Sequence, residues 1–160
     1  MTIAKLNVTL TAVFVVISAL TVAIFSSPLR TLVAIVDLLL FAIGVATFIW
    51  GYFSAVQRSR SDEISVAGLF LLIDGVAPKS VARLMNSALI IQIVVGILAA
   101  IIRHSTNGVS GSTLAFGVLV PLLGLGLNGL WASKYGTFNQ RIAPQVSTPE
   151  REIGKDGGHG

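Results

Sequence analysis

Residues 31–52 read TLVAIVDLLLFAIGVATFIWGY and contain a single charged side chain, that of Asp37. Because a helix rises about 1.5 Å per residue, this stretch is long enough to cross the ~30 Å hydrocarbon core of a bilayer. Three further stretches, at about 8–25, 84–102 and 114–132, are of similar length and contain no charge. The sequence therefore predicts an all-α polytopic membrane protein with four transmembrane helices.

The composition argues against a water-soluble domain. Charged residues make up 11% of the chain, whereas about a quarter is usual in soluble proteins. The four stretches are apolar on all sides, as helices exposed to lipid are. Cysteine is absent, which excludes disulfides and thiolate chemistry. The net charge is +4, but no basic stripe with interleaved aromatic residues is present, so we exclude nucleic acid and expect the lipid bilayer as the partner.

The distribution of basic residues predicts the orientation in the membrane. With four spans, nine of the eleven lysines and arginines fall on one side, and only Arg30 and Arg103 fall on the other. The side rich in basic residues is normally cytoplasmic. We therefore expect a multi-pass protein of the inner (plasma) membrane with both termini in the cytoplasm and a first helix that is retained. Four aromatic residues are expected at headgroup level on the same side: Trp50, Tyr52, Trp131 and Tyr135.

The segment DEISVAGLFLLIDG, residues 62–75, is too short to be a fifth span. Its apolar part would extend ~15 Å as a helix, about half the hydrocarbon thickness. We predict a short interfacial or re-entrant helix over about 62–74, capped by Ser61, ended by Gly75 and followed by Pro78 in the first turn of the third span. A transmembrane domain over 1–138 then precedes a polar tail over 139–160, which is predicted to be disordered.

We single out three polar residues inside the predicted spans. Asp37 is interpreted either as a protonatable or cation-binding group, or as a structural carboxyl that is neutral or is paired with Arg30 or Arg103. The structural interpretation is preferred, because relays usually contain several ionisable groups and no second acidic residue lies in any span. Gln92 and Asn128 are expected to form hydrogen bonds between helices, with a ligand-lining role as the alternative.

The string Gly124-Leu-Gly126-Leu-Asn128-Gly129 matches the dinucleotide-binding pattern Gly-x-Gly-x-x-Gly. That motif requires a turn between a strand and a helix, and here it lies inside a span. We therefore assign Gly124, Gly126, Gly129 and Gly96 to close packing between helices. Pro121 should kink the fourth span.

Catalytic and metal-binding patterns are absent from the sequence. His104 and His159 are isolated from each other, and no nucleophile is paired with a base. No cofactor-binding pattern is credible either. The sequence therefore predicts a protein that is not an enzyme.

The second half of the chain carries two groups of residues that resemble a family of small actinobacterial integral membrane proteins without an assigned activity. The resemblance covers about 58–141, and the chain has Asn139 where the family pattern usually has proline. It implies a four-helix architecture and supplies no function. The groups are Arg58-Ser-Arg60-Ser-Asp62-Glu63-Ile64 with Gly68, Phe70, Ala77-Pro78 and Gln92, and Ala115-Phe116-Gly117 with Pro121, Gly124, Gly126, Gly129-Leu130-Trp131-Ala132 and Gly136-Thr137-Phe138.

Three functions are consistent with these features. The favoured one is an accessory or scaffold subunit that assembles with itself or with a larger membrane complex through small-residue helix faces. The second is a small oligomeric transporter or proton-coupled carrier that uses Asp37. The third is binding of anionic lipid headgroups by a basic ring on the cytoplasmic side. The residues of that ring are Arg58, Arg60, Lys79 and Arg83.

Overall fold

The computed structural model describes residues 2–106 and 109–141. In this part of the chain, four helical segments are long and apolar enough to cross a membrane, which confirms the predicted number. The first three are α1 (Thr2–Ile24), α2 (Ser27–Arg58) and α4 (Lys79–Ile102). The fourth consists of a 3₁₀ helix, η1 (Thr113–Leu119), followed by α5 (Pro121–Tyr135). Each helix extends beyond the predicted span.

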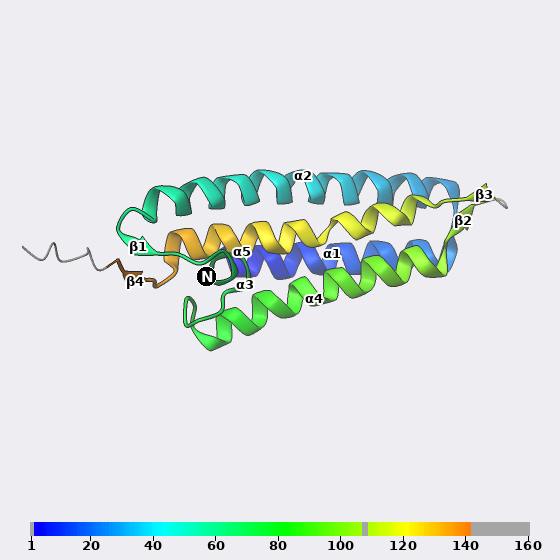
Figure 1. Cartoon of the computed structure of the whole chain (residues 1–160). Coiled ribbons are helices and arrows are strands. Elements are labelled where there is room, and N and C mark those ends of the chain that lie inside the picture. The colour runs from blue at the N-terminus through cyan, green and yellow to red at the C-terminus, as the bar shows by residue number, and fades with distance from the viewer. Residues whose placement is uncertain (1, 107–108, 142–160) are drawn as a thin grey trace, which may run out of the picture.

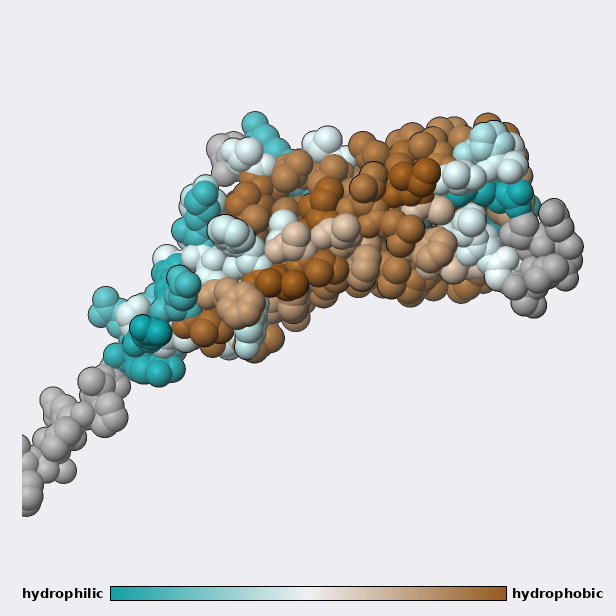
Figure 2. Space-filling view, turned by 90° about the horizontal axis from the view of Figure 1, so that it is seen from above, coloured by the Kyte–Doolittle hydropathy of each residue, from teal (hydrophilic) through white to brown (hydrophobic). Residues whose placement is uncertain are grey.

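The four segments form an antiparallel bundle (Figure 1). The N-terminal end of α1 and the last described residues lie at the same end of the bundle, as an even number of passes requires. We call this the terminal end. An apolar surface covers the middle of the molecule, and polar residues gather at its two ends (Figure 2). This distribution is the one expected of a protein that a bilayer surrounds.

Glycines allow α2 and α5 to approach each other at backbone distance. A Cβ atom added at Gly44 of α2 would lie 2.5 Å from the backbone nitrogen of Leu123. One added at Gly126 of α5 would lie 2.5 Å from the carbonyl oxygen of Gly44. In hydrocarbon, helices associate through close packing of this kind, because lipid removes the hydrophobic driving force between them. The pair α2–α5 is therefore the most tightly packed part of the bundle.

The fourth span is broken at the position of the expected kink. Seven residues before Pro121 are 3₁₀-helical, although 3₁₀ runs longer than three or four residues are uncommon. The tight hydrogen bonding continues across the junction. Val120 N–H donates to the Gly117 carbonyl at 3.2 Å, and Leu123 N–H donates to the Val120 carbonyl at 2.8 Å. Pro121 is the first residue of α5, where its missing N–H costs nothing.

The segment 62–74 is not one helix, so this prediction was wrong in its extent. Asp62–Glu63 form a strand, β1, that pairs antiparallel with β4 (Asn139–Gln140). The helix α3 (Val66–Leu71) begins only after Ser65, whose hydroxyl accepts from Gly68 N–H at 2.9 Å. The side chain of Asp62 is instead bound to Arg58 at 2.5 Å, so it is not available to a helical first turn.

The predicted tail boundary at 139 is also wrong, because Asn139 and Gln140 belong to β4. The remainder of the predicted disordered tail, 142–160, lies outside the described residues. At the opposite end of the bundle, β2 (Ser105–Thr106) pairs antiparallel with β3 (Val109–Ser110) and connects α4 to η1.

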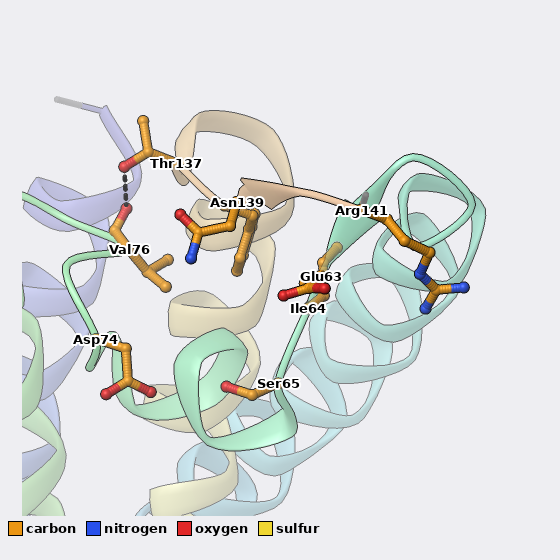
Figure 3. Close-up of a pocket in the computed structure, with 9 residues that line it drawn as sticks. Glu63, Ile64, Ser65, Asp74, Val76, Thr137, Asn139 and Arg141 are labelled. Carbon is orange, nitrogen blue, oxygen red and sulfur yellow. Dashed lines mark hydrogen bonds between the residues drawn. The ribbon is translucent and has the colours of Figure 1, made fainter. Parts of the chain in front are cut away.

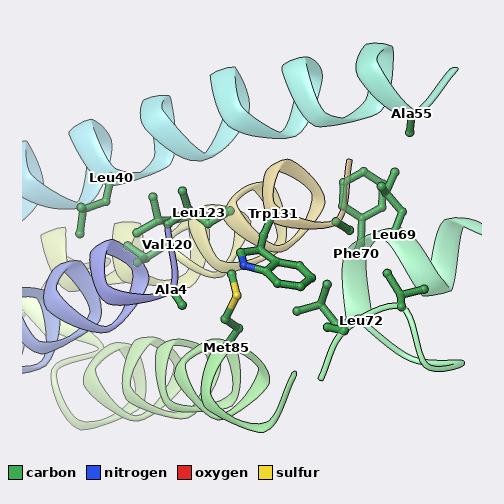
Figure 4. Close-up of a cluster of buried hydrophobic side chains, with 14 of the residues drawn as sticks. Ala4, Leu40, Ala55, Leu69, Phe70, Leu72, Met85, Val120, Leu123 and Trp131 are labelled. Carbon is green, nitrogen blue, oxygen red and sulfur yellow. The ribbon is translucent and has the colours of Figure 1, made fainter. Parts of the chain in front are cut away.

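The apolar core lies where α5 meets the other helices (Figure 4). Leu123 and Met85 are fully buried there. Phe70 of α3 stacks on Phe48 of α2 with ring centroids 4.3 Å apart, which holds the short helix under the bundle. Trp131 is only 6% exposed and belongs to this core. Its ring therefore packs mainly against protein, whereas the ring of Trp50 is 70% exposed.

Candidate functional site

The side of α1 that faces the bundle is polar. Asn7, Thr11, Ser18 and Thr21 are buried, and their spacings of four, seven and three residues place them on one helix face. Polar groups inside and apolar groups outside are what a lipid environment favours. The outward side of the helix carries exposed apolar residues: Leu6, Val13, Val16 and Leu20.

Gln92 of α4 lies at the centre of the polar interior and links three helices. Its amide nitrogen donates to Thr11 Oγ1 at 2.6 Å and to Asn7 Oδ1 at 3.3 Å, both on α1. Its oxygen accepts from the Gly124 backbone N–H of α5 at 3.1 Å. Gln92 therefore has partners on both sides of its amide, as a buried polar group requires.

A glycine is needed for the contact between Gln92 and α5. A Cβ atom at Gly124 would lie 2.7 Å from the Gln92 amide oxygen. Such a distance would push the amide out of hydrogen-bonding range. The contact also lies just after the junction at Pro121, where the Val120 carbonyl already accepts from Leu123 N–H. The Gly124 N–H next to the break in the fourth span thus donates to the side chain of Gln92.

Asn128 makes the second link between helices, nearer the terminal end. Its amide nitrogen donates to the Phe70 carbonyl of α3 at 2.9 Å and to Asn86 Oδ1 of α4 at 3.0 Å. Asn86 in turn donates to the Leu71 carbonyl at 2.6 Å. The Phe70 and Leu71 carbonyls lie in the last turn of α3, where no further helical N–H is available to them. The two asparagines supply the missing donors.

Asp37 of α2 is buried beside the 3₁₀ helix. Its side chain is 1% exposed, and its Oδ1 atom has no hydrogen-bond partner. A Cβ atom at Gly117 of η1 would lie 3.4 Å from Asp37 Oδ2 and 3.4 Å from the ring of Phe14 on α1. The carboxyl therefore faces the irregular part of the fourth span, and the Phe14 ring lies beside the same face of Gly117.

The predicted ion pair of Asp37 with Arg30 or Arg103 is not formed. In the described residues the one ion pair joins Arg58 and Asp62. Arg103 instead donates to the Val22 carbonyl at 2.7 and 3.1 Å. Both Arg30 and Arg103 stack on the Phe25 ring, at 5.1 and 4.7 Å from its centroid. The reason is that both arginines lie at the end of the bundle, where α1 turns into α2, and the Phe25 ring and a free carbonyl are within reach there.

The chemistry available to this interior is limited to hydrogen bonding and to the carboxyl of Asp37. Across residues 2–106 and 109–141, no group of three His, Asp or Glu residues could hold a metal ion. A lone buried carboxyl can hold a proton or a small cation, and it can exchange either with water when the surrounding helices move. Residues that carry such groups inside membranes are usually functional.

A second polar site lies at the terminal end, between β1, α3 and β4 (Figure 3). It is an open cavity of about 520 Å³. Thr137 closes one side of it by a 3.4 Å hydrogen bond to the Val76 carbonyl. Carboxylates and a guanidinium line the same cavity and mix the two signs of charge. The charged lining residues are Glu63, Asp74 and Arg141.

The four basic residues predicted to bind lipid headgroups differ in their environment. Arg58 is held by Asp62 and lies over the Phe138 ring, 5.0 Å from its centroid. It serves to fix the start of β1 against the chain after α5. The other three, Arg60, Lys79 and Arg83, are exposed.

The glycines assigned to helix packing all face neighbouring elements. A Cβ atom added at Gly96 would lie 2.5 Å from the Gly117 carbonyl oxygen. One added at Gly129 would lie 2.5 Å from the Phe70 ring. Gly124 and Gly126 face Gln92 and α2, as described above. The Gly-x-Gly-x-x-Gly string lies within α5, and not at the strand-to-helix turn that dinucleotide binding requires.

Sequence reasoning missed the polar face of α1 and the role of Asn86. The signal was present, because Asn7, Thr11, Ser18 and Thr21 recur at helical spacing. Threonine and serine are only weakly polar, so the mean hydropathy of the first span stays high. The high mean concealed the pattern.

Comparisons with known proteins identify no relative of this chain: no protein-family model, curated protein or solved structure matches it. The resemblance to small actinobacterial membrane proteins is not tested by these comparisons and stays a prediction.

Proposed function

We propose that this chain is a non-enzymatic integral membrane protein that carries protons or small cations across the membrane, with Asp37 as the exchanging group. Four helices of membrane-spanning length support insertion. The excess of lysine and arginine on one side supports cytoplasmic termini.

The observation that carries this proposal is the position of Asp37, buried without a counter-ion beside a broken helix. An ionised carboxyl costs about 2.5–3.5 kcal/mol at the centre of a membrane helix on insertion scales, and less away from the centre. No ion pair or hydrogen bond in the described residues offsets that cost for Asp37. Non-α-helical backbone at membrane depth is likewise tolerated where it is buried in protein or lines a path for ions. Transporters combine these two features in discontinuous helices.

Buried polar groups on both sides of Asp37 would form the path. Phe14 lies at the level of Asp37. Ser18 and Thr21 follow Phe14 by four and seven residues of α1, or roughly 6 and 10 Å. In the opposite direction Thr11 and Gln92 lead toward the terminal end. Phe14 would act as the barrier between the two polar sections, because its ring is fully buried between them.

The packing of the small residues argues against the accessory or scaffold role. That role was motivated by small-residue faces that could bind other helices. Gly44, Gly96, Gly124, Gly126 and Gly129 are instead in contact with other parts of the same chain. Assembly into an oligomer or a larger membrane complex stays a proposal without a specific surface.

Proton flux into liposomes tests the proposal. The full-length protein is reconstituted with an enclosed pH-sensitive dye, and a potassium diffusion potential drives protons inward. We expect faster acidification than in empty liposomes, and a return to the empty-liposome rate with Asp37→Asn. The amide keeps the shape of the side chain but cannot exchange a proton.

Asp74→Asn is the matched control. Asp74 is exposed at the terminal end and has a φ of 58°, a conformation that asparagine tolerates well. This variant should transport at the wild-type rate. Wild-type liposomes that acidify no faster than empty ones, or an Asp37→Asn variant with full flux, would contradict the proposal.

A further inference from the structure

The outer surface between α1 and α4 carries a row of apolar cavities that the proposed transport path does not use. Cavities of about 390, 370 and 330 Å³ follow one another from the terminal end toward the opposite end. Residues of α1 and α4 line all three. We call this row the α1–α4 groove. It is open toward the side where lipid would lie, and it shares Thr11 and Ser18 of α1 with the polar interior behind it.

Small side chains create the groove. Ala12 on α1 and Ser87 and Ala88 on α4 line its middle section, where larger residues would fill the space between the helices. The hydroxyl of Thr11 is bound to Gln92 in the interior. The surface that this section of the groove exposes is therefore almost entirely apolar. Such a surface suits a hydrocarbon chain.

The length of the groove fits one leaflet of a bilayer. From Lys5 in the first cavity to Val16 in the second is eleven residues of α1, or roughly 16 Å along the helix. Half of a ~30 Å hydrocarbon core is ~15 Å. The first two cavities together could therefore hold one acyl chain from the headgroup level to the middle of the membrane.

The end of the groove at headgroup level is basic and rich in hydrogen-bond donors. Lys5, Ser80 and Tyr135 line the first cavity beside Trp131. Among the described residues no carboxylate lies within ion-pair distance of Lys5, and no acidic residue lines any of the three cavities. Arg83 is exposed one turn before Ser87 on the same helix. The charge of this end complements a phosphate.

We propose that the α1–α4 groove binds one anionic phospholipid, with the phosphate at Lys5, Ser80 and Tyr135 and an acyl chain against Ala12 and Ala88. Charge complementarity at one end and a leaflet-length apolar channel below it select this occupant over a partner helix. A helix would not need a cation at this position. The lysine and hydroxyl groups lie where amphipathic side chains contact headgroups.

Native mass spectrometry of the full-length protein in mild detergent tests this site. The probes are dioleoylphosphatidylglycerol, which is anionic, and dioleoylphosphatidylcholine, which has no net charge. We expect one tightly bound phosphatidylglycerol per chain and weaker binding of phosphatidylcholine. Lys5→Gln should weaken phosphatidylglycerol binding about fivefold and leave phosphatidylcholine unchanged, because one basic residue near the headgroup is lost.

Ala12→Phe tests the apolar part of the site, because the larger ring would fill the groove. It should abolish both the tight binding of phosphatidylglycerol and the weaker binding of phosphatidylcholine. Two controls change exposed residues outside the three cavities: Arg141→Gln for the charge and Ala42→Phe on α2 for the added ring. Both should bind phosphatidylglycerol as the wild type does.

Two outcomes would overturn the proposal. Equal binding of the two lipids, or phosphatidylglycerol binding that Lys5→Gln and Ala12→Phe leave unchanged, would show that the groove does not select an anionic lipid. A wild-type dimer that Ala12→Phe converts to monomers, without a change in lipid binding, would assign the groove to a second copy of the chain. Neither result depends on whether the protein transports protons.

Discussion

At the scale of single residues, the interior is organised by a few amides and one carboxyl. Gln92 contacts α1 and α5 at once, and Asn128 contacts α3 and α4. An amide suits these positions because it can donate and accept in hydrocarbon without the cost of a charge. Asp37 has the opposite property: its ionised carboxyl is costly to bury in hydrocarbon, and it has no hydrogen-bond or ion-pair partner in the described residues. This contrast is the reason for assigning packing to the amides and exchange to the carboxyl.

Gln92→Leu should destabilise the protein strongly for a single substitution. A hydrogen bond between membrane helices is worth ~0.6 kcal/mol on average. Here the leucine would leave the Gly124 N–H and the polar atoms of Asn7 and Thr11 without their partner, and each unsatisfied buried group costs ~1–3 kcal/mol. We expect a loss of about 1–3 kcal/mol in the free energy of unfolding, measured by titration with SDS in mixed micelles.

The same substitution at Gln57, which is exposed near the end of α2, is the control. It should change the unfolding free energy by less than about 0.5 kcal/mol, as is usual for surface positions. If Gln92→Leu were as mild as Gln57→Leu, the hydrogen bonds of Gln92 would not be important for stability.

At the scale of elements, the pairs α2–α5 and α1–α4 have different roles. Glycines bring the backbones of α2 and α5 into contact, and this pair forms the rigid part of the bundle. Alanine and serine line the surface between α1 and α4, where a groove stays open to lipid. The irregular η1 lies between these two pairs and contacts Asp37 through Gly117. A change in η1 would therefore alter the surroundings of the carboxyl without separating α2 from α5.

Gly44→Ala should push α2 and α5 apart. The new methyl group would lie 2.5 Å from the Leu123 nitrogen and 2.7 Å from the Leu122 carbonyl carbon. Backbone atoms cannot move aside as a side chain can, so we expect a loss of about 1–3 kcal/mol, the usual cost of overpacking. SDS titration measures it. The larger change Ala46→Leu, at an exposed position of the same helix, should be nearly neutral; equal losses in the two variants would count against the close contact.

At the scale of the whole molecule, the fold has the arrangement that a bilayer demands. Its middle is covered by apolar side chains, and hydrophilic residues gather at the two ends (Figure 2). The described chain starts and finishes at the terminal end. The nine basic residues assigned to one side of the membrane belong to this end or to the residues that follow it in the sequence.

Reporter fusions test the orientation that follows from these charges. A fluorescent protein that matures only in the cytoplasm should be active when fused before Met1 or after Gly160. An alkaline phosphatase, which is active only outside the cytoplasm, should be inactive at both positions and active when inserted near His104. A phosphatase that is active after Gly160 would require an odd number of spans or the inverted orientation.

The sequence by itself determined the helical class of the protein and the number of its helices that are long and apolar enough to cross a membrane. Length and hydropathy suffice for this, because a helix must cover a fixed hydrocarbon thickness whatever its neighbours are. It also identified Asp37, Gln92 and Asn128, because polar residues are conspicuous in apolar stretches. The extent of α3 was not predictable, since it depends on the pairing of β1 with residues 76 and 78 positions later in the chain.

Only the tertiary structure decided how each helix is rotated about its axis, and with it the partner of every polar group. Where all sides of a helix are apolar, hydropathy does not specify which side faces inward. Packing specifies it instead. Contacts among glycines set the pair α2–α5, and the buried polar face of α1 follows from its hydrogen bonds to Gln92. For the same reason the partners of Arg30 and Arg103 could not be derived from their distance to Asp37 along the sequence.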